Sequence, residues 1–389
     1  MSIPRLQHVN DPLRDAVMKR VCDEEPEEAQ MPGMTLPPQA DAVFEGGGVK
    51  GIAFAGAVGA AEAAGVREWK NLAGTSAGAI AACLLVVGYH ADDLDRILRI
   101  EYREFADYGW GGLPRGVITA VWKRGLARGV FFERWMREQV AQSPVARRLG
   151  KKELTFGDIA RDDLPTTLSD ADRRLARYRL RVIASDLTAG QMLVLPQDIT
   201  HLSRTKNGPP IACDELGLVE AVRMSMSFPY FFTPVRLWEG DRPHDIVDGG
   251  LLSNFPVWLF DSPTGQPARP TWGFRLHGGT GADEMPPNRR IRPPLWPISM
   301  AKAMFEATTE AWDREHVAHA QSVRTIDIPT GSISVLDFRL KPQEAQKLRD
   351  TAARRARDAF AGPAVAAYLD DTEWSDGFKR PEGSFAVAQ

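Results

Sequence analysis

Two glycine-rich motifs, each standing between a strand-like and a helix-like segment, most constrain what this chain can fold into. FEGGGVKGIAFAG at 44–56 follows a short apolar run that begins at Asp41, and it leads into a run of small residues. GTSAG at 74–78 ends the strand-like segment REWKNLAGTS and opens the apolar segment AGAIAACLLVVGYH. This alternation of strands and helices predicts an α/β fold, with a mainly parallel central sheet and helices on both faces.

The same reading places further elements along the chain. We expect two strands around a turn in 178–196, a helix over 211–228, strands ending near Asp248 and Gly279, a strand over 322–331 and a final amphipathic helix over 341–362. The predicted organisation is an acidic and proline-bearing extension at 1–40, a catalytic domain at 41–345 with a helical insertion at about 92–160, and a C-terminal helix and tail at 346–389.

The first motif admits two interpretations. Gly46, Gly48 and Gly51 spell G-x-G-x-x-G, the pattern of a dinucleotide-binding turn. A Rossmann unit, however, needs an acidic residue at the end of its second strand to hold the ribose. Here that strand ends in GTSAG, and Lys50 is followed by glycine where a P-loop needs Ser or Thr. We interpret the match as coincidence, and a nucleotide-binding module using Gly46–Gly51 stays as the alternative from another functional class.

The second motif has the form G-x-S-x-G, a nucleophile elbow. A sharp turn from strand to helix forces the serine into a strained conformation, and glycines two residues to each side remove side chains that would collide there. Gly74 and Gly78 hold these positions around Ser76. The helix N-terminus beneath the serine favours negative charge at this place. We therefore predict that Ser76 is a nucleophile.

A serine that attacks an ester needs N–H groups aimed at the oxyanion. The loop formed by Gly46, Gly47, Gly48 and Val49 supplies candidates, because consecutive glycines leave backbone N–H groups without side-chain cover. Both loops follow strands, so they should lie side by side at the carboxyl edge of the sheet. Lys50 is expected to be structural or to contact an anionic head group.

The general base is less apparent from the residues alone. None of the seven histidines lies in a distinctive motif, and His277, at the end of a predicted strand, is the best placed of them. Asp248 opens a glycine turn with Gly249 and Gly250 at the end of another strand. An aspartate before glycine is common in turns without any catalytic role. The local patterns therefore do not decide whether His277 or Asp248 is the base.

The two glycine motifs and the D-G-G turn together resemble the patatin-like phospholipases. AVRMSMSFPYFFTPV before the turn and SDLTAGQMLVL in the middle of the chain extend the resemblance over about 41–274. It implies a three-layer α/β/α fold and a Ser76–Asp248 dyad without histidine, with the glycine loop as oxyanion hole and elbow and turn support from Gly74, Gly78, Gly249 and Gly250. A carboxyl with an ordinary pKa near 3.9 is a weak base at pH 7, so its surroundings must raise that pKa.

The resemblance implies a lipid acyl hydrolase that cleaves phospholipids or lysophospholipids through an acyl-serine, with no cofactor and no metal. A soluble carboxylesterase or an acyltransferase on the same dyad is the alternative, because the elbow does not distinguish water from another acceptor. A scaffold without activity is the interpretation that we favour least, because the chain contains the serine, the aspartate and both glycine loops. The requirement for a protein activator is left open.

A phospholipid surface is the expected partner. Between Arg96 and Lys152 there are 13 Lys/Arg and 5 Asp/Glu, mixed with aromatic residues, while the whole chain carries −3. Basic and aromatic residues suit an anionic bilayer, although a helical insertion with core aromatics explains them too. The proline-rich segment at 287–297 is a candidate lid.

Net charge offers no general attraction for nucleic acid, and the scattered cysteines lack metal-ligand spacing. The N-terminus has no apolar core of a signal peptide, and the run at 77–87 is about half the ~20 residues that span a bilayer. We expect a cytoplasmic protein with peripheral membrane contact, and secretion without a cleaved signal stays open.

Overall fold

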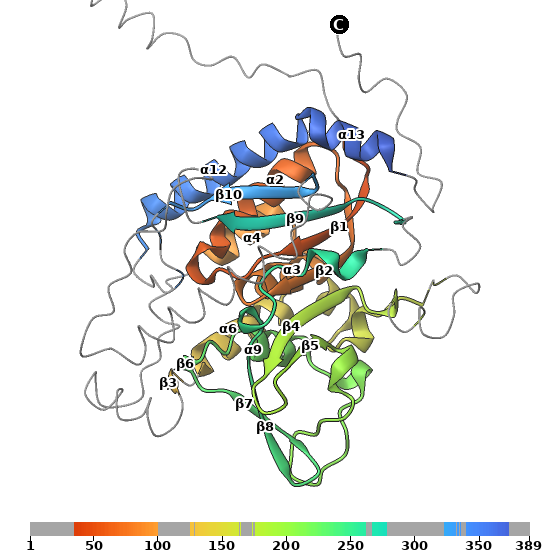
Figure 1. Cartoon of the computed structure of the whole chain (residues 1–389), viewed down its shortest axis with the longest axis vertical. Coiled ribbons are helices and arrows are strands. Elements are labelled where there is room, and N and C mark those ends of the chain that lie inside the picture. Colours follow the sequence, from red (N-terminus) through yellow and green to blue (C-terminus); the bar gives the residue numbers. More distant parts are fainter. Residues whose placement is uncertain are drawn as a thin grey trace, which may run out of the picture.

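A computed structural model describes residues 35–99, 125–127, 129–162, 176–261, 267–277, 323–331 and 340–372, together with residues 164, 173, 333 and 335. Its centre is a mixed sheet in the strand order β10–β9–β1–β2–β4–β8–β7, with β5 paired to β4 (Figure 1). The bounds are β1 Gln39–Phe44, β2 Glu68–Thr75, β4 Leu180–Asp186, β5 Gln191–Leu195, β7 Val235–Glu239, β8 Arg242–Asp248, β9 Thr271–His277 and β10 Thr325–Pro329. A separate parallel pair joins β3 Gly125–Ala127 to β6 Tyr230–Phe232.

The five strands from β10 to β4 run parallel, whereas β5 and β8 lie antiparallel to β4, and β7 antiparallel to β8. The sheet therefore has the predicted parallel centre, and β5, β8 and β7 add antiparallel pairs to it at β4. The hairpin of β7 and β8 was not predicted from the sequence.

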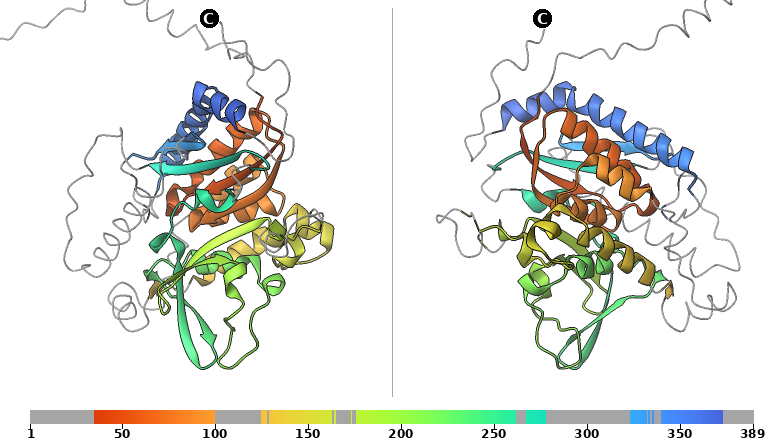
Figure 2. Two further views of the ribbon diagram at one scale, coloured as in Figure 1. Left: turned by 45° about the vertical axis from the view of Figure 1, so that its right-hand side comes forward. Right: turned by 180° about the vertical axis from the view of Figure 1, so that it is seen from behind.

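Helices pack on this sheet, and several of them gather on one face, as the view from behind shows (Figure 2). The described helices are α2 Ala53–Ala63, α3 Ala77–Val86, α4 Ala91–Leu98, α6 Val130–Ala141, α7 Pro144–Leu149, α9 Leu218–Ser225, α12 Pro342–Phe360 and α13 Pro363–Asp371. Short 3-10 turns include η1 Gly48–Ile52, which precedes α2, η6 Gly249–Leu251, and η7 Val257–Phe260.

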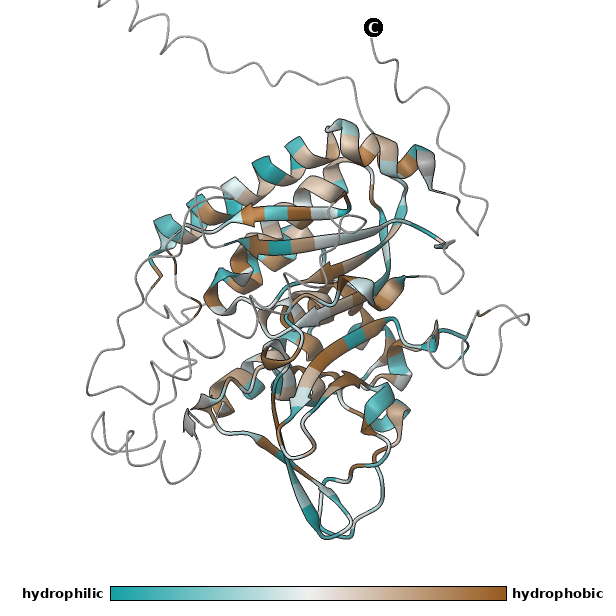
Figure 3. Cartoon of the chain, viewed as in Figure 1, coloured by the Kyte–Doolittle hydropathy of each residue, from teal (hydrophilic) through white to brown (hydrophobic). Residues whose placement is uncertain are grey.

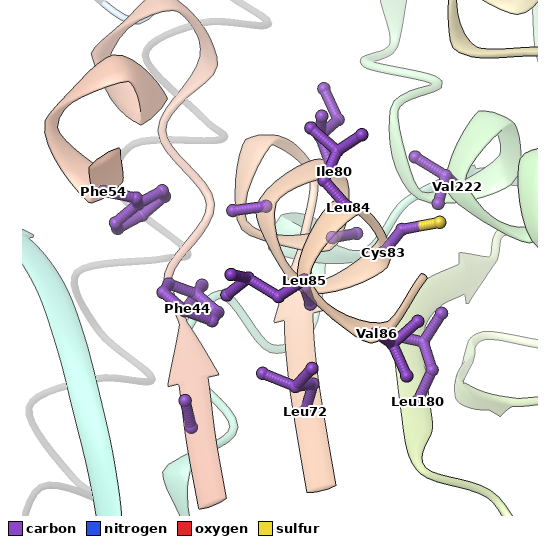
Figure 4. Packing of buried hydrophobic residues seen from close by; sticks show 14 of the residues in the cluster. Phe44, Phe54, Leu72, Ile80, Cys83, Leu84, Leu85, Val86, Leu180 and Val222 are labelled. Carbon is purple, nitrogen blue, oxygen red and sulfur yellow. The ribbon is translucent and has the colours of Figure 1, made fainter. Parts of the chain in front are cut away.

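Alternation along the strands divides the core between the two faces of the sheet. Phe44 belongs to the large cluster under the helices, where it meets Phe54 edge-on at 5.2 Å (Figure 4). Its ring also stacks on that of Phe274 at 5.1 Å. Its neighbour Val43 points to the opposite face and packs with Val257 of η7. Successive strand residues face opposite sides, so both faces are covered and the α/β/α layering expected from the sequence is confirmed.

Small residues bring the helices close to one another. A Cβ on Gly56 of α2 would collide with the backbone of Arg349 on α12. The long helix α12 buries Leu348, Ala352, Ala356 and Phe360, and its polar residues lie on the outer side (Figure 3). A glycine in α2 thus permits the close contact between the helix after the glycine loop and the C-terminal helix.

Some sequence-based expectations differ from the structure, and others concern residues that the structure does not describe. The helix expected over 211–228 begins only at Leu218, because Gly217 is extended (φ −69°, ψ 139°) and caps it. The candidate lid at 287–297 lies outside the described residues, and the predicted domain boundaries remain predictions. Within the described ranges, none of the helices combines the length and apolarity that spanning a bilayer requires.

Candidate active site

Ser76 joins β2 to α3 and adopts φ 53° and ψ −121°. Residues other than glycine rarely take a positive φ, so the backbone is strained here. A Cβ on Gly74 would collide with the backbone of Gly78, and one on Gly78 would collide with the backbone of Phe44. The elbow expected from GTSAG is therefore the observed turn, and its two glycines are required by close backbone contacts.

The sheet places Asp248 next to this elbow. Thr75 of β2 pairs with Ile183 on β4, and Asp248 of β8 pairs with Ala184, the next residue of β4. Because β5 occupies the other edge of β4 at both levels, β2 and β8 share one edge of that strand. Where the chain leaves β2 at Ser76, β8 thus takes the place of β2 beside β4.

The Asp248 carboxyl is buried, with 1% of the residue exposed. Burial raises the pKa of this carboxyl to about 7, and hydrogen bonds from the Gly250 N–H and the Ser76 hydroxyl oppose the rise. The Gly250 bond to Oδ1 measures 2.9 Å. An aspartate with this pKa can take up a proton near neutral pH, as a general base must.

The Ser76 hydroxyl has a second neighbour. Its Oγ lies 3.6 Å from Sδ of Met226, which follows α9. A hydroxyl has one proton and rotates to suit its acceptor, so the thioether and the Asp248 carboxyl compete for it. Ser76 itself is 9% exposed.

The glycine loop lies beside Ser76: a Cβ on Gly46 would be 3.3 Å from the Ser76 Cβ. Of the four N–H groups expected to form an oxyanion hole, two already have acceptors. The Gly46 N–H donates to the Asn254 carbonyl at 3.1 Å, and the Val49 N–H to the Val335 carbonyl at 3.2 Å. Gly47 and Gly48 donate to no group in the described part of the chain.

The remaining predicted residues have structural surroundings of their own. Lys50 lies in η1 and is 9% exposed, and its contact with a head group stays a prediction. A Cβ on Gly249 would collide with the Ile183 backbone, so this glycine lets the turn after β8 lie against β4.

His277 is exposed at the end of β9 and makes no hydrogen bond to Ser76 within the described ranges. A different histidine is buried beside a carboxylate: His244 Nδ1 lies 2.6 Å from Asp186 Oδ2. Asp186 Oδ1 also accepts from the N–H groups of Thr188 and Ala189, so the pair holds the turn between β4 and β5.

Sequence reasoning missed three neighbours of the site. The Ser225 hydroxyl accepts the Ser76 N–H at 2.8 Å, Asn254 contacts Gly46, and Ala77 places the first N–H of α3 next to Ser76. A helix leaves its first N–H groups without internal acceptors. The elbow motif could have identified Ala77, because the residue after the serine begins the helix. No local pattern marks Ser225 or Asn254 as neighbours of the site.

This chain belongs to the patatin-like phospholipase family, whose model matches residues 42–261. It is 33% identical over 319 residues to the uncharacterized protein YqhO of Bacillus subtilis strain 168, which covers 81% of this chain and 96% of that protein. Family membership supports lipid hydrolase activity.

Two solved structures are also similar. VipD from Legionella pneumophila has a TM-score of 0.47 at 17% identity, covering 83% of this chain and 67% of the other. ExoU in its complex with SpcU, from the type III secretion system of Pseudomonas aeruginosa, has a TM-score of 0.40 at 17% identity. That match covers 84% of this chain and 52% of the other, so the chain spans about half of the ExoU length.

Proposed function

We propose that the chain hydrolyses fatty-acyl esters of phospholipids or lysophospholipids, with Ser76 as nucleophile and Asp248 as general base. One observation carries the proposal: the hydroxyl of a strained serine lies beside a buried carboxyl whose pKa is about 7. Membership of the patatin-like phospholipase family supports the substrate class.

In the acylation half, Ser76 Oγ attacks the ester carbonyl carbon and its proton passes to the Asp248 carboxylate. The carbonyl oxygen becomes an oxyanion, for which we assign the N–H groups of Gly47 and Gly48 as donors, with Ala77 as a third. Each such donor stabilises the transition state by about 3 kcal/mol. When the tetrahedral intermediate collapses, the alcohol leaves with the proton that Asp248 took up.

In the deacylation half, water attacks the acyl-serine and gives a proton to Asp248. The second tetrahedral intermediate expels Ser76 Oγ, which regains the proton, and the fatty acid departs. The same carboxyl is therefore a base toward the nucleophile and an acid toward the leaving group in each half.

A membrane surface as the site of action is part of the proposal, although the described aromatics of the basic stretch offer it little support. Phe132 and Trp135 of α6 are buried in the core, at 1% and 8% exposure. The exposed basic residues there are the better candidates for contact with an anionic bilayer: Arg134, Arg137, Arg147, Arg148, Lys151 and Lys152.

The test is release of fatty acid from phospholipid vesicles, compared with release from short soluble esters. We expect Ser76→Ala and Asp248→Asn each to lower the rate by about 10⁴ or more, as removal of a catalytic nucleophile or base does in other serine hydrolases. Asp245→Asn is the matched control, because Asp245 lies on the same strand and its carboxylate pairs with Arg236. A preference for soluble esters would favour a carboxylesterase, and near-normal activity of Asp248→Asn would contradict the dyad.

A further inference from the structure

We propose that Asn254 is a positioning residue, whose side-chain amide fixes the direction of the Gly47 N–H in the oxyanion loop. The inference rests on the proposed function, because it concerns the donors assigned to the oxyanion. It follows from a set of buried contacts between the turn after Asp248 and the glycine loop.

Asn254 holds Gly46 from two sides. Its backbone carbonyl accepts the Gly46 N–H at 3.1 Å, and its Nδ2 donates to the Gly46 carbonyl at 3.1 Å. Asn254 is 7% exposed, and its Oδ1 fills the space that a Cβ on Gly46 would occupy. Gly46 is therefore held by hydrogen bonds and by contact with the same residue.

The carbonyl of Gly46 and the N–H of Gly47 belong to one peptide unit. That unit is planar and trans, so the carbonyl and the N–H point in opposite directions. Fixing the carbonyl on Asn254 Nδ2 consequently fixes the N–H of Gly47. Without that bond a Gly–Gly peptide can rotate at small cost, because glycine tolerates both signs of φ.

The asparagine is itself held in place. Its Nδ2 also donates to Glu45 Oε1 at 3.1 Å, and Glu45 Oε2 accepts the N–H of Leu276 on β9. Two acceptors around one nitrogen define the orientation of the amide. The network thus ties the glycine loop to β9 as well as to the turn that carries Asp248.

The same turn also contacts the elbow. The hydroxyl of Thr75 donates to the Ser253 carbonyl at 3.0 Å in a fully buried position. Ser253 and Asn254 are adjacent, so one dipeptide sets the distance between the residue before the nucleophile and the oxyanion loop. Asp248, six residues earlier, is outside these contacts, and its pKa should not depend on Asn254.

The experiment measures kcat and KM on a short p-nitrophenyl ester for the full chain carrying Asn254→Ala or Asn254→Asp. The number of active sites is determined by stoichiometric labelling with a fluorophosphonate, so that misfolded protein does not enter kcat. We expect kcat per labelled site to fall by about 10²-fold in both variants, as for loss of an oxyanion donor. KM and the pH midpoint of kcat/KM should stay unchanged.

Asn71→Ala is the matched control: the Asn71 side chain on β2 donates to Asp41 on β1 at 3.0 Å, before the carboxyl ends of these strands, where the site lies. It should leave kcat per labelled site as in the wild type. The inference is wrong, and the proposed function stands, if the wild type is active and kcat per labelled site in both Asn254 variants is within twofold of the wild-type value. The same conclusion holds if the variants change KM only. A wild type that neither labels at Ser76 nor cleaves esters would overturn the proposed function, and the inference with it.

Discussion

The Ser225 hydroxyl accepts the backbone N–H of Ser76 at 2.8 Å, although the two residues are 149 positions apart in the chain. Ser225 ends α9 and is fully buried, whereas Ser76 has a positive φ at the start of α3. The bond gives the N–H of a strained residue an acceptor that α3 cannot provide. It links Ser76 to the helix that precedes the β7–β8 hairpin.

Replacing Ser225 by alanine should therefore disturb Ser76. The buried N–H would lose its acceptor, which costs about 1–3 kcal/mol of stability, and a displaced nucleophile should lower kcat by about tenfold or more. Ser203→Ala is the control, since that buried hydroxyl bonds the Thr205 and Trp238 carbonyls away from the site. Denaturant unfolding and kcat separate the effects: equal kcat in the two variants would contradict a role at the nucleophile.

The pH dependence of activity follows from the Asp248 pKa of about 7. Only the carboxylate accepts a proton, so kcat/KM should rise with pH through a midpoint at about 7 and level off above it. An ordinary histidine titrates near 6.5, and His277→Ala therefore has to be measured in parallel. We expect that variant to keep the wild-type profile, and a lost midpoint there would identify histidine as the base.

Stability should change with pH in the opposite direction. The pKa of Asp248 is higher in the folded chain than the ordinary value of 3.8, so the folded state binds more protons between these values. Its contribution is fully present below pH 3.8 and is lost as pH rises through about 7, by on the order of 4 kcal/mol. Asp248→Asn should remove this loss. The unfolding free energies at pH 5 and pH 8 measure the part that falls between these two pH values, which is about 3 kcal/mol.

The elbow glycines can be tested by their packing. Gly78→Ala should destabilise the chain by several kcal/mol, because its Cβ would collide with the Phe44 backbone. Gly59→Ala in α2 is the comparison. The nearest atom to the new Cβ would be 3.4 Å away, and alanine is more favourable than glycine in a helix by about 1 kcal/mol. Similar thermal midpoints for the two variants would contradict the steric requirement.

Short sequence motifs predicted those parts of the candidate site that consist of consecutive residues. GTSAG and the glycine loop could be identified from sequence because an elbow and a strand-to-helix turn are each determined by a few consecutive residues. Asp248 was not distinguishable from ordinary turn chemistry by its own motif. Its proposed role follows from the family resemblance. It lies near Ser76 because β2 and β8 pair with consecutive segments of the same edge of β4.

Contacts between distant segments were not predictable in the same way. Gly46 and Val49 were grouped with Gly47 and Gly48 as equivalent donors, but their N–H groups donate to Asn254 and Val335. Nothing in a single sequence indicates which loop amides find acceptors more than 200 residues away. The same holds for Ser225, which reaches Ser76 only through the packing of α9.

The central claim is that Ser76 is a nucleophile activated by Asp248. Its most direct measurement is the rate of covalent labelling by a fluorophosphonate in wild type and Asp248→Asn, with the labelled peptide identified by mass spectrometry. We predict a label on Ser76, a rate that rises with pH through about 7, and a strongly reduced, pH-independent rate in the variant. A label on another residue, or equal rates in the two proteins, would contradict the dyad.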